Sequence, residues 1–596
     1  MREKIAISFF VAILLILLTR VYYISVKSHV LYAQIAKNNI TKTEDISPQR
    51  GIIRDRNAIA LAVNKLGFSI ALAPHLRGKS KFAIFNKEIS KISKYFPKYK
   101  KEYLKKEYLK KDSPYVHKYV KVISFLSYDK LIPYFSEISL DPYIKIASAS
   151  KRYYPYGKLL SHIIGYVSKA NIRDIRHDKV ASLTGFIGKT AIEKYYNKVL
   201  EGTPGIKITE VSAYNKEVKV LKKVMPTKKN ITLNIDVRLE EYISKLFKGK
   251  TGAIIVMNAK TGAIIAADSY PGFDPNEFVN GISYKEWKKI STDFNHPFTN
   301  KLINGLYPPG SIVKPGVALS FLDSRYINKN TIFFDPGFIE LGGRKFRCWK
   351  KDGHGKVNII KAIRESCDVY FYKGSLKVGI DRMSKTLTRF GFGQRTGVDL
   401  PNESVGILPS RKWKLKKYGK PWFQGETVIS AIGQGYFLVT PMQIAKYTAI
   451  LATGKSVTPH FIYKIGNKKI LYQEKPLFSK KENRYLRTIR KGMYEVANSP
   501  HGTAMYYLHR CKVTLAAKTG TAQIVGIPQE EKKRMKEDEL TYFKRSQAWL
   551  TTYGPYKNPQ YVVTVLVEHG GHGGSAAGPM VSKIFNKLLK LGYIKI

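Results

Sequence analysis

Three short motifs in a fixed order carry the residue types of a serine acyl-transfer centre. A serine with a lysine three residues later stands at Ser311 and Lys314, and a Ser-x-Asp triplet follows at Ser366 and Asp368. The third motif is a Lys-Thr-Gly-Thr run at Lys518, Thr519, Gly520 and Thr521. In this order the motifs are typical of enzymes whose serine attacks an amide carbonyl. We therefore predict that Ser311 is a nucleophile.

Each motif alone is weak evidence, because a lysine-rich chain produces the same triplets by chance. Residues 148–151 also read Ser-x-x-Lys, and residues 260–262 also read Lys-Thr-Gly. Context separates them, since only Ser311 follows a Pro-Pro-Gly segment after which a helix can begin. Only Lys518 precedes a further threonine and a strand-like region. The alternative for Ser311 is a helix N-cap without catalytic function.

The spacing of serine and lysine indicates how the hydroxyl would be activated. Residues three apart on a helix have β-carbons about 5–6 Å apart, so the amine of Lys314 can reach Ser311. Only a neutral amine can act as a base, and a positive charge on Lys518 would lower the pKa of Lys314. The backbone N–H groups of Ser311 and Thr521 are candidates for an oxyanion hole.

The Ser-x-Asp motif supplies a hydroxyl and a carboxylate to the same centre. We expect Ser366 to relay the proton that the leaving amine receives. A carboxylate beside Lys314 would raise the pKa of that lysine. We therefore expect the charge of Asp368 to be shared with Lys518.

An apolar stretch from Ile5 to Val26 is long enough to cross a membrane. At about 1.5 Å per residue it measures about 33 Å, against a bilayer core of about 30 Å. Residues 20–24, Arg-Val-Tyr-Tyr-Ile, are bulky where a cleavage site would need small residues, so we predict an uncleaved anchor. Arg2 and Lys4 place the amino end in the cytoplasm. In a bacterium the remaining chain would then be periplasmic, held by a single span in the inner membrane.

The chain is strongly basic, with 102 Lys and Arg against 44 Asp and Glu and a formal net charge of +58. Such a charge raises nucleic acid as a partner. The lysines are spread along the whole chain, however, and no aromatic-basic single-strand motif accompanies them. We therefore expect no nucleic-acid partner and favour a basic face toward anionic lipid or cell-wall polymer. A plain lysine bias in composition is the alternative.

Changes in composition along the chain divide it into parts. We predict a cytoplasmic tip and anchor over residues 1–26, a non-catalytic pedestal over 27–227 and a catalytic domain over 228–596. Lysine and tyrosine dominate an inserted lobe at about 77–150. There the repeated Lys-Glu-Tyr-Leu-Lys of 101–110 predicts an exposed helix with Glu–Lys pairs. A helical arm that binds a partner is the alternative.

Strand-like runs at both ends of the catalytic domain predict an α+β fold. Apolar runs at 253–257 and 263–267 flank the Lys-Thr-Gly of 260–262, which we expect to form a hairpin turn. Further strand-like runs lie at 548–553 and 562–567. We expect helices in the part of the domain between these two groups of strands. This order predicts an antiparallel sheet with helices on both sides.

The three motifs together resemble those of class B penicillin-binding proteins, monofunctional D,D-transpeptidases that cross-link peptidoglycan. The Arg50-Gly51 to Arg56 segment resembles their pedestal, or dimerisation-type, domain. The elongation subtype, penicillin-binding protein 2, has Ser-x-Asp where the division subtype has Ser-x-Asn, and it shares the runs at 348–355 and 570–574. The resemblance implies a penicillin-binding transpeptidase fold.

The same resemblance implies the reaction and its partners. The donor would be a stem peptide ending in D-Ala-D-Ala, which forms an acyl-enzyme on Ser311, and β-lactams would acylate the same serine. The acceptor would be an amine of a neighbouring stem. A membrane-embedded glycosyltransferase of the elongation machinery and a rod-shape scaffold protein would be the partners.

The cysteines offer a metal site beside the second motif. Cys348, His354 and Cys367 lie close in sequence, and Asp335 is a candidate fourth ligand. This donor set suits one structural zinc ion. The resemblance implies a metal at Asp, His and Cys positions, with Cys348 where an Asp is expected. A Cys348–Cys367 disulfide or two buried thiols remain alternatives, and Cys511 is expected to be a core thiol.

Two other functions use the same motifs. A β-lactamase of the Ser-x-x-Lys type would hydrolyse its acyl-enzyme quickly, but such enzymes are usually small and secreted, without an anchor. A non-catalytic antibiotic sensor would be acylated only to signal. Sensors keep a cytoplasmic output module, and the few residues before Ile5 cannot form one. We therefore favour the transpeptidase.

Overall fold

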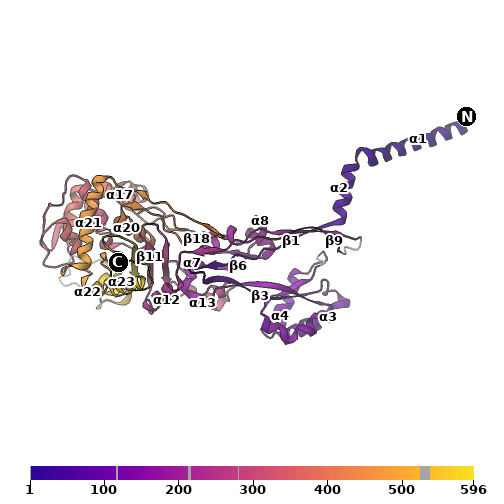
Figure 1. Ribbon diagram of the computed structural model, residues 1–596, viewed down its shortest axis with the longest axis horizontal. Helices are drawn as coiled ribbons and strands as arrows, with labels where there is room; N and C mark the ends of the chain where they lie inside the picture. Colours follow the sequence, from indigo (N-terminus) through magenta and orange to yellow (C-terminus); the bar gives the residue numbers. More distant parts are fainter. Residues whose placement is uncertain are drawn as a thin grey trace. The chain divides into compact units, whose positions relative to one another are not determined.

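The structure is a computed structural model of the chain (Figure 1). It describes residues 2–115, 118–212, 217–279, 281–523, 537 and 539–595. The chain forms two compact units. Unit 1 comprises residues 1–51, 170–186 and 198–229, and unit 2 comprises residues 52–169, 187–197 and 230–596. The domain limits at 26, 227 and 228 stay a prediction.

Unit 1 carries the apolar N-terminal helix. Helix α1 (Arg2–Tyr22) continues through a π-helical turn (Tyr23–Lys27) and is followed by α2 (His29–Ile40). An 18-residue window within residues 3–27 has a mean hydropathy of 2.4, and none of it is buried by the protein, as expected for a span. A three-stranded antiparallel sheet follows, in the order β1 (Thr41–Ile46), β8 (Gly205–Val211) and β9 (Glu217–Val224). The described part of this unit also contains two short helices, α8 (Ile172–His177) and α9 (Lys179–Thr184).

The first part of unit 2 is built on a long sheet. Its strands run in the order β19-β18-β10-β2-β3-β4, and β5 also pairs with β3. Their bounds are β2 Ile53–Arg54, β3 Ala60–Leu72, β4 Val120–Leu126, β5 Ile144–Tyr153, β10 Ile231–Leu233, β18 Ile462–Ile465 and β19 Lys468–Lys469. The short elements after β5 are α7 (Ser161–Ile164), β6 (Val167–Lys169) and α10 (Ala191–Tyr195).

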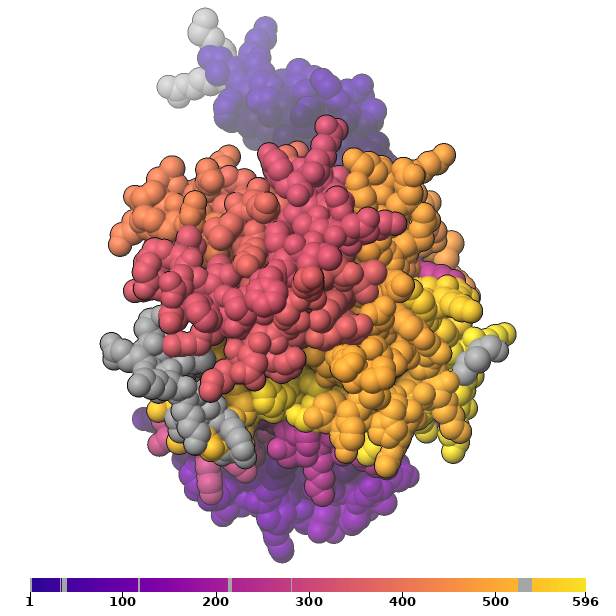
Figure 2. All heavy atoms as spheres, turned by 90° about the vertical axis from the view of Figure 1, so that its left-hand side faces the viewer, coloured from indigo at the N-terminus to yellow at the C-terminus, as the bar shows by residue number. Residues whose placement is uncertain are grey.

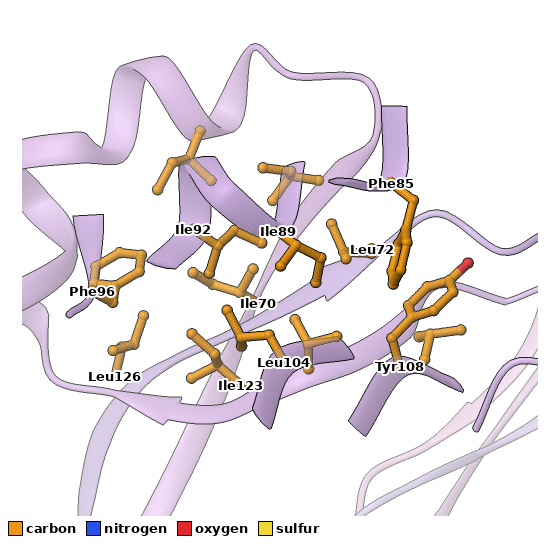
Figure 3. Packing of buried hydrophobic residues seen from close by; sticks show 14 of the residues in the cluster. Ile70, Leu72, Phe85, Ile89, Ile92, Phe96, Leu104, Tyr108, Ile123 and Leu126 are labelled. Atoms are coloured by element: carbon orange, nitrogen blue, oxygen red, sulfur yellow. The ribbon is translucent and has the colours of Figure 1, made fainter. Parts of the chain in front are cut away.

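The lysine- and tyrosine-rich lobe has a hydrophobic core of its own (Figure 3). Helices α3 (Phe82–Tyr95) and α4 (Lys101–Lys111) pack on β3 and β4. The predicted helix and its Glu–Lys pair are confirmed, since Lys111 Nζ lies 2.7 Å from Glu107 Oε2. The helix is not merely exposed, however. Leu104 and Tyr108, four residues apart, are completely buried because they form an apolar stripe within the lysine run.

The catalytic part of unit 2 contains a five-stranded antiparallel sheet in the order β12-β11-β23-β22-β21. Its strands are β11 Gly252–Asn258, β12 Ile264–Tyr270, β21 Ala516–Ala522, β22 Gln547–Gly554 and β23 Tyr561–Val567. The Lys-Thr-Gly of 260–262 forms the turn between β11 and β12, as predicted.

Helices cover both faces of this sheet. On one face Thr551 of β22 contacts Thr448 of α20 (Pro441–Thr453), with 2.7 Å between their hydroxyl oxygens. Gly554, an odd number of residues from Thr551 and so on the opposite face, lies against Phe585 of α23 (Gly573–Lys590). The predicted α+β class is therefore confirmed.

A helical block precedes the last strands. Its longer helices are α12 Val237–Leu246, α13 Tyr284–Ser291, α14 Lys314–Asp323, α15 Ile359–Arg364, α16 Asp368–Val378, α17 Ile380–Arg389, α18 Arg411–Tyr418, α19 Gln424–Ala431 and α21 Lys480–Asn498. Two-stranded ribbons pair β13 (Phe333–Asp335) with β16 (Gly355–Val357) and β14 (Phe338–Leu341) with β15 (Arg344–Arg347). Segments of this block, red around residue 350 and orange around residue 490, adjoin on the face that Figure 2 shows. Arg364 of α15 and Glu495 of α21 form an ion pair.

Candidate active site

The segment before Ser311 is fixed to its neighbours by backbone hydrogen bonds. Tyr307 and Val439 exchange two of them, at 3.0 and 2.9 Å, and Gly310 N donates to Gly433 O at 2.9 Å. Ser311 then lies inside a 3-10 turn (Gly310–Val313) that leads directly into α14. Neither this turn nor α14 is capped by a serine side chain, so the N-cap alternative for Ser311 is wrong.

Two buried lysine amines meet at the hydroxyl of Ser366. Lys314 Nζ lies 3.2 Å from Ser366 Oγ, and Lys518 Nζ lies 3.0 Å from the same oxygen. Both lysines are completely buried. One residue from each of the three motifs therefore meets at this hydroxyl.

The carboxylate of Asp368 pairs directly with Lys314 and acts on Lys518 through its charge. It forms an ion pair with Lys314, at 2.7 Å, and its second oxygen accepts a hydrogen bond from Trp349 N at 2.9 Å. The amine of Lys518 instead donates to Thr519 O at 3.0 Å. Burial, and then the charge of Lys314, hold the pKa of Lys518 well below its usual range, while Asp368 opposes that shift.

Strand β21, which carries the third motif, is an edge strand of the five-stranded sheet. The bond from Lys518 to Thr519 O shows that the backbone groups of Thr519 point away from β22. Backbone groups alternate along a strand, so those of Thr521 point the same way. A β-carbon on Gly310 would lie 3.1 Å from Thr521 O, which places the Ser311 turn beside this free edge.

Sequence reasoning missed two residues that support the motifs. Thr503 and Thr519 share a hydrogen bond of 2.8 Å between their hydroxyl oxygens. Trp349 holds Asp368 through its backbone N–H, and its indole donates to Glu365 O at 3.0 Å. Neither contact has a sequence signal, because each arises when distant segments pack together.

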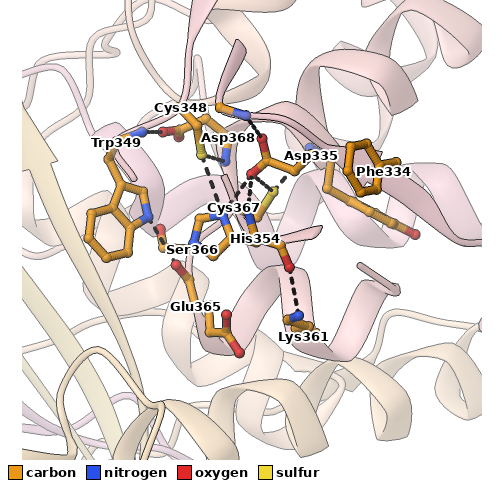
Figure 4. A network of polar contacts seen from close by, with 12 residues as sticks. Phe334, Asp335, Cys348, Trp349, His354, Lys361, Glu365, Ser366, Cys367 and Asp368 are labelled. Atoms are coloured by element: carbon orange, nitrogen blue, oxygen red, sulfur yellow. Dashed lines mark hydrogen bonds and ion pairs between the residues drawn. The ribbon is translucent and has the colours of Figure 1, made fainter. Parts of the chain in front are cut away.

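The four predicted metal ligands converge beside the Ser-x-Asp motif (Figure 4). One ligand atom from each of Asp335, Cys348, His354 and Cys367 lies within 4.8 Å of the others, and all four residues are buried. Asp335 Oδ2 is 2.7 Å from His354 Nδ1 and 3.2 Å from Cys367 Sγ. Both cysteines are free thiols, so no disulfide joins them in this structure.

Hydrogen bonds within the cluster shift the pKa values of its groups, and a metal would have to displace the proton of His354. A hydrogen bond from Cys367 lowers the pKa of Cys348 to about 6, and His354 assists although burial opposes the shift. Burial would lower the pKa of His354, but the bond to Asp335 raises it to about 9. Burial would raise the pKa of Asp335, yet the bond from His354 holds it well below its usual range. A thiolate and a carboxylate together are the anionic donors that zinc prefers.

The ligand cluster and the second motif are structurally continuous. Cys367 stands between Ser366 and Asp368, and its sulfur caps α16 by accepting a hydrogen bond from Tyr370 N at 3.4 Å. Asp368 N donates to Cys348 Sγ at 3.3 Å. Ser366 itself adopts a left-handed backbone conformation, with φ of 55°. The cluster therefore sets the turn that presents Ser366 and Asp368.

The remaining candidates lie elsewhere. Ser148 is exposed within strand β5, which leaves it no turn or helix of the kind that positions Ser311. Cys511 is half-buried rather than a core residue, and burial raises the pKa of its thiol to about 11.

Comparison with known proteins decides the family. Residues 252–590 match the family described as the penicillin binding protein transpeptidase domain, and residues 45–233 match the penicillin-binding protein dimerisation domain. The chain is also 34% identical over 592 residues to the peptidoglycan D,D-transpeptidase MrdA of Escherichia coli K12, covering 96% of this chain and 91% of that protein. The chain belongs to the penicillin-binding protein 2 family. As a member of it, the chain is a serine-type peptidoglycan D,D-transpeptidase of cell elongation and a β-lactam target.

Solved structures agree with membership of the penicillin-binding protein 2 family. The complex between penicillin-binding protein 2 and MreC from Helicobacter pylori is 45% identical, with a TM-score of 0.86 over 93% of this chain and 99% of that one. A structure of a peptidoglycan synthase complex that coordinates polymerization and crosslinking is 26% identical, with a TM-score of 0.69 over 98% and 97% of the two chains. These likenesses confirm the transpeptidase and decide against the β-lactamase and sensor alternatives.

Proposed function

We propose that Ser311 is the nucleophile of this transpeptidase and that Lys314, Ser366 and Lys518 carry the proton it releases. The observation that supports this most directly is the Ser366 hydroxyl, which lies within 3.2 Å of both lysine amines. A hydroxyl between two amines can accept a proton from one while it donates to the other. The proposal thus gives each of the three motifs a distinct role.

The two lysines would share one positive charge. Lys314 is ion-paired with Asp368, whereas the pKa of Lys518 is lowered, so Lys518 is the amine more easily made neutral. A proton can pass from Lys314 through Ser366 to Lys518, which leaves Lys314 neutral to accept the proton of Ser311. The serine oxygen then bonds to the carbonyl carbon of the penultimate D-Ala. When the amide C–N bond breaks, the same path returns the proton to the leaving D-Ala amine.

The free edge of β21 would hold the stem peptide as an added strand. Unpaired N–H and C=O groups on an edge strand bind extended peptides by main-chain hydrogen bonds. The N–H of Thr521 faces that edge beside the Ser311 turn, so Ser311 N and Thr521 N are the proposed oxyanion donors. The acceptor amine of a second stem would then attack the acyl-enzyme and restore Ser311.

We also propose that Asp335, Cys348, His354 and Cys367 hold one zinc ion. Their anionic donors and close packing fit a closed tetrahedral site. The ion would act as a structural element beside the catalytic centre. Proton transfer and acyl transfer would remain with the side chains of Ser311, Lys314, Ser366 and Lys518.

The relatives support proposals about partners and location. The Helicobacter pylori neighbour is bound to MreC, and another neighbour belongs to a peptidoglycan synthase complex. We infer that this chain works with a scaffold protein of that type and with a membrane-embedded glycosyltransferase. Arg2 and Lys4 precede the apolar stretch that begins at Ile5, which supports a cytoplasmic N-terminus, an inner-membrane span and a periplasmic catalytic domain.

The decisive experiment is covalent labelling with a fluorescent penicillin, read by intact mass. Ser311→Ala should gain no adduct, while the matched Ser148→Ala variant should be labelled like the unmodified chain. Thermal unfolding checks that both variants fold. An adduct on the folded Ser311→Ala variant would show that another residue is the nucleophile.

A further inference from the structure

The backbone around Ser311 changes from one helix type to another. Residues 310–313 form a 3-10 turn, and the α-helix begins only at Lys314. A 3-10 helix has 3.0 residues per turn, so side chains three residues apart eclipse one another, whereas in an α-helix they are about 60° apart. Ser311 and Lys314 are three residues apart. The tighter turn therefore aligns the side chain of Lys314 with that of Ser311.

Pro315 removes one hydrogen bond that a regular α-helix would form here. In such a helix the N–H of residue 315 would donate to Ser311 O, four residues earlier. Proline has no N–H to donate. Ser311 O instead accepts a hydrogen bond from Lys314 N, three residues later, which is the 3-10 pattern. The proline therefore favours the tight turn.

The hydroxyl of Tyr447 takes the place of the next hydrogen bond. A regular α-helix would join Gly316 N directly to Ile312 O. Gly316 N donates to Tyr447 Oη at 2.8 Å. The hydroxyl in turn donates to Ile312 O, at 3.1 Å, or to Val313 O, at 3.3 Å. It thus bridges a donor and an acceptor that would bond to each other in a regular helix, and all of these contacts are buried.

The ring of Tyr447 is fixed in the core by helix α20 and by two other rings. Tyr447 is completely buried, and the ring centroids of Phe390 and Phe392 lie 5.1 and 5.0 Å from its own. Burial raises the pKa of Tyr447, so the hydroxyl keeps the proton that it donates. The bridge therefore comes from a rigid part of the molecule.

Gly316 leaves the space that the tyrosine occupies. A β-carbon at this position would lie 3.0 Å from Cε2 of Tyr447 and 3.3 Å from its hydroxyl oxygen. It would also lie 3.0 Å from Cδ2 of Leu387. These distances are shorter than the optimum of about 3.5–4.0 Å between carbon atoms. The glycine and the tyrosine therefore fit one another, although they are 131 residues apart in the chain.

We propose that Tyr447 is a positioning residue for the nucleophile. Its hydroxyl holds the 3-10 turn and so aligns Ser311 with Lys314. Without the hydroxyl, Gly316 N can bond directly to Ile312 O, and the turn relaxes toward an α-helix that rotates Ser311 away from the lysine. Tyr447 contacts backbone groups of this segment and takes no part in proton transfer. The inference rests on the proposed roles of Ser311 as nucleophile and Lys314 as base.

The test compares Tyr447→Phe with Tyr553→Phe in the full chain. Both substitutions keep a buried aromatic ring and remove a hydroxyl, but the hydroxyl of Tyr553 has no hydrogen-bond partner among the described residues. Stopped-flow acylation by a fluorescent penicillin gives the dissociation constant of the non-covalent complex and the rate constant of acylation. Intact mass after complete reaction gives the fraction of chains that can react.

Tyr447→Phe should lower the acylation rate constant about 10–100-fold, because a small misplacement of reacting groups has an effect of this size. The dissociation constant should not change, and all chains should still react in the end. Tyr553→Phe should acylate at the normal rate. A purely structural role of Tyr447 would instead reduce the fraction of reactive chains and leave their rate constant unchanged. That result, or a normal rate constant in Tyr447→Phe, would overturn the proposal.

A double-mutant cycle tests whether Tyr447 acts through Lys314. In a Lys314→Ala background Ser311 has no amine with which to align, so adding Tyr447→Phe should slow acylation by less than about twofold. An equal loss in both backgrounds would refute this route. Ser311→Ala separates the inference from the proposed function. A labelled Ser311→Ala variant would refute the nucleophile, whereas an unlabelled one beside a normally acylating Tyr447→Phe would refute only the positioning role.

Discussion

Ser366 is the residue at which the chemistry of the three motifs meets. Its hydroxyl contacts the amine of Lys314, which forms an ion pair with Asp368, and the amine of Lys518, whose pKa is lowered by burial. Two fully charged amines in one buried site would repel each other strongly. The arrangement avoids this cost by pairing one lysine with a carboxylate and by favouring the neutral form of the other.

The two lysines should therefore respond differently to removal. Lys314→Ala should slow acylation by penicillin about 10²–10⁴-fold, the usual contribution of a general base. Non-covalent binding before acylation should change little, because the base acts mainly in the transition state. Lys518→Ala should weaken both steps, since Lys518 also supports the strand edge through Thr519 O. Stopped-flow acylation separates the two effects, and an unchanged rate in Lys314→Ala would remove it as the base.

At the scale of residues, the sequence predicted which residue types form the site and in which order they occur, but not which side chains pair with one another. The motif residues could be found because each function needs a particular side chain at a fixed spacing. The partner of Asp368 could not be found, because Lys314 and Lys518 are both lysines and only packing decides which amine lies nearer. Thr503 and Trp349 were missed for the same reason, since Trp349 acts through a backbone N–H that any residue possesses.

At the scale of elements, the start of α16 joins the metal cluster to the catalytic centre. Cys367 caps the helix, Ser366 precedes it in a left-handed conformation, and Asp368 is its first residue. The β13 and β16 ribbon brings Asp335 and His354 to the same place. The ligand set could be predicted from residue type, whereas this ribbon could not, because its short strands carry no hydrophobic pattern.

Loss of the proposed zinc should therefore affect folding and chemistry together. The purified chain should retain about one equivalent of zinc after exhaustive dialysis, as expected for a closed four-ligand site. Cys348→Ser should lower the zinc content, the unfolding temperature and the acylation rate, because Cys348 also accepts a bond from Asp368 N. Cys511→Ser is the matched control and should retain zinc. Zinc far below one equivalent, or a Cys348–Cys367 disulfide in peptide mapping, would contradict the site.

The hydrophobic core of the lobe can be tested by comparing two leucines of helix α4. Leu104 is fully buried, whereas Leu109 on the same helix is 48% exposed. Leu104→Ala should destabilise the lobe by about 2–5 kcal/mol, the usual cost of a large-to-small change in a core. Leu109→Ala should change stability by less than about 0.5 kcal/mol. Limited proteolysis within the lobe reports the difference, and equal protection of the two variants would argue against a cooperative core there.

At the scale of the whole molecule, the sequence predicted an anchor, a lobe and an α+β catalytic sheet because each has a strong periodic or compositional signal. Contacts between distant segments carry no such signal. A cavity lined by His162 and Asn300 is assembled from five separate stretches of chain, so no local pattern predicts it. Burial of titratable groups likewise belongs to the folded molecule and not to any motif.

That burial predicts how the molecule responds to acid. The pKa of His162 falls from 6.5 to about 4 on folding, so between these values the unfolded chain binds a proton that the folded chain does not. The contribution of neutral His162 to stability is present above pH 6.5 and is lost as the pH falls toward 4. The loss is at most about 3 kcal/mol.

The comparison with His162→Gln isolates this effect from other groups. Glu240 and Asp268 are buried with raised pKa values, and they act in the opposite direction by favouring the folded state at low pH. Glutamine cannot take up a proton, so the unfolding temperature of the variant should fall less between pH 7 and pH 4.5 than that of the unmodified chain. Thermal unfolding at both pH values measures the two losses. Equal falls in unfolding temperature would mean that His162 is protonated in the folded molecule and that it is more accessible to water than its burial indicates.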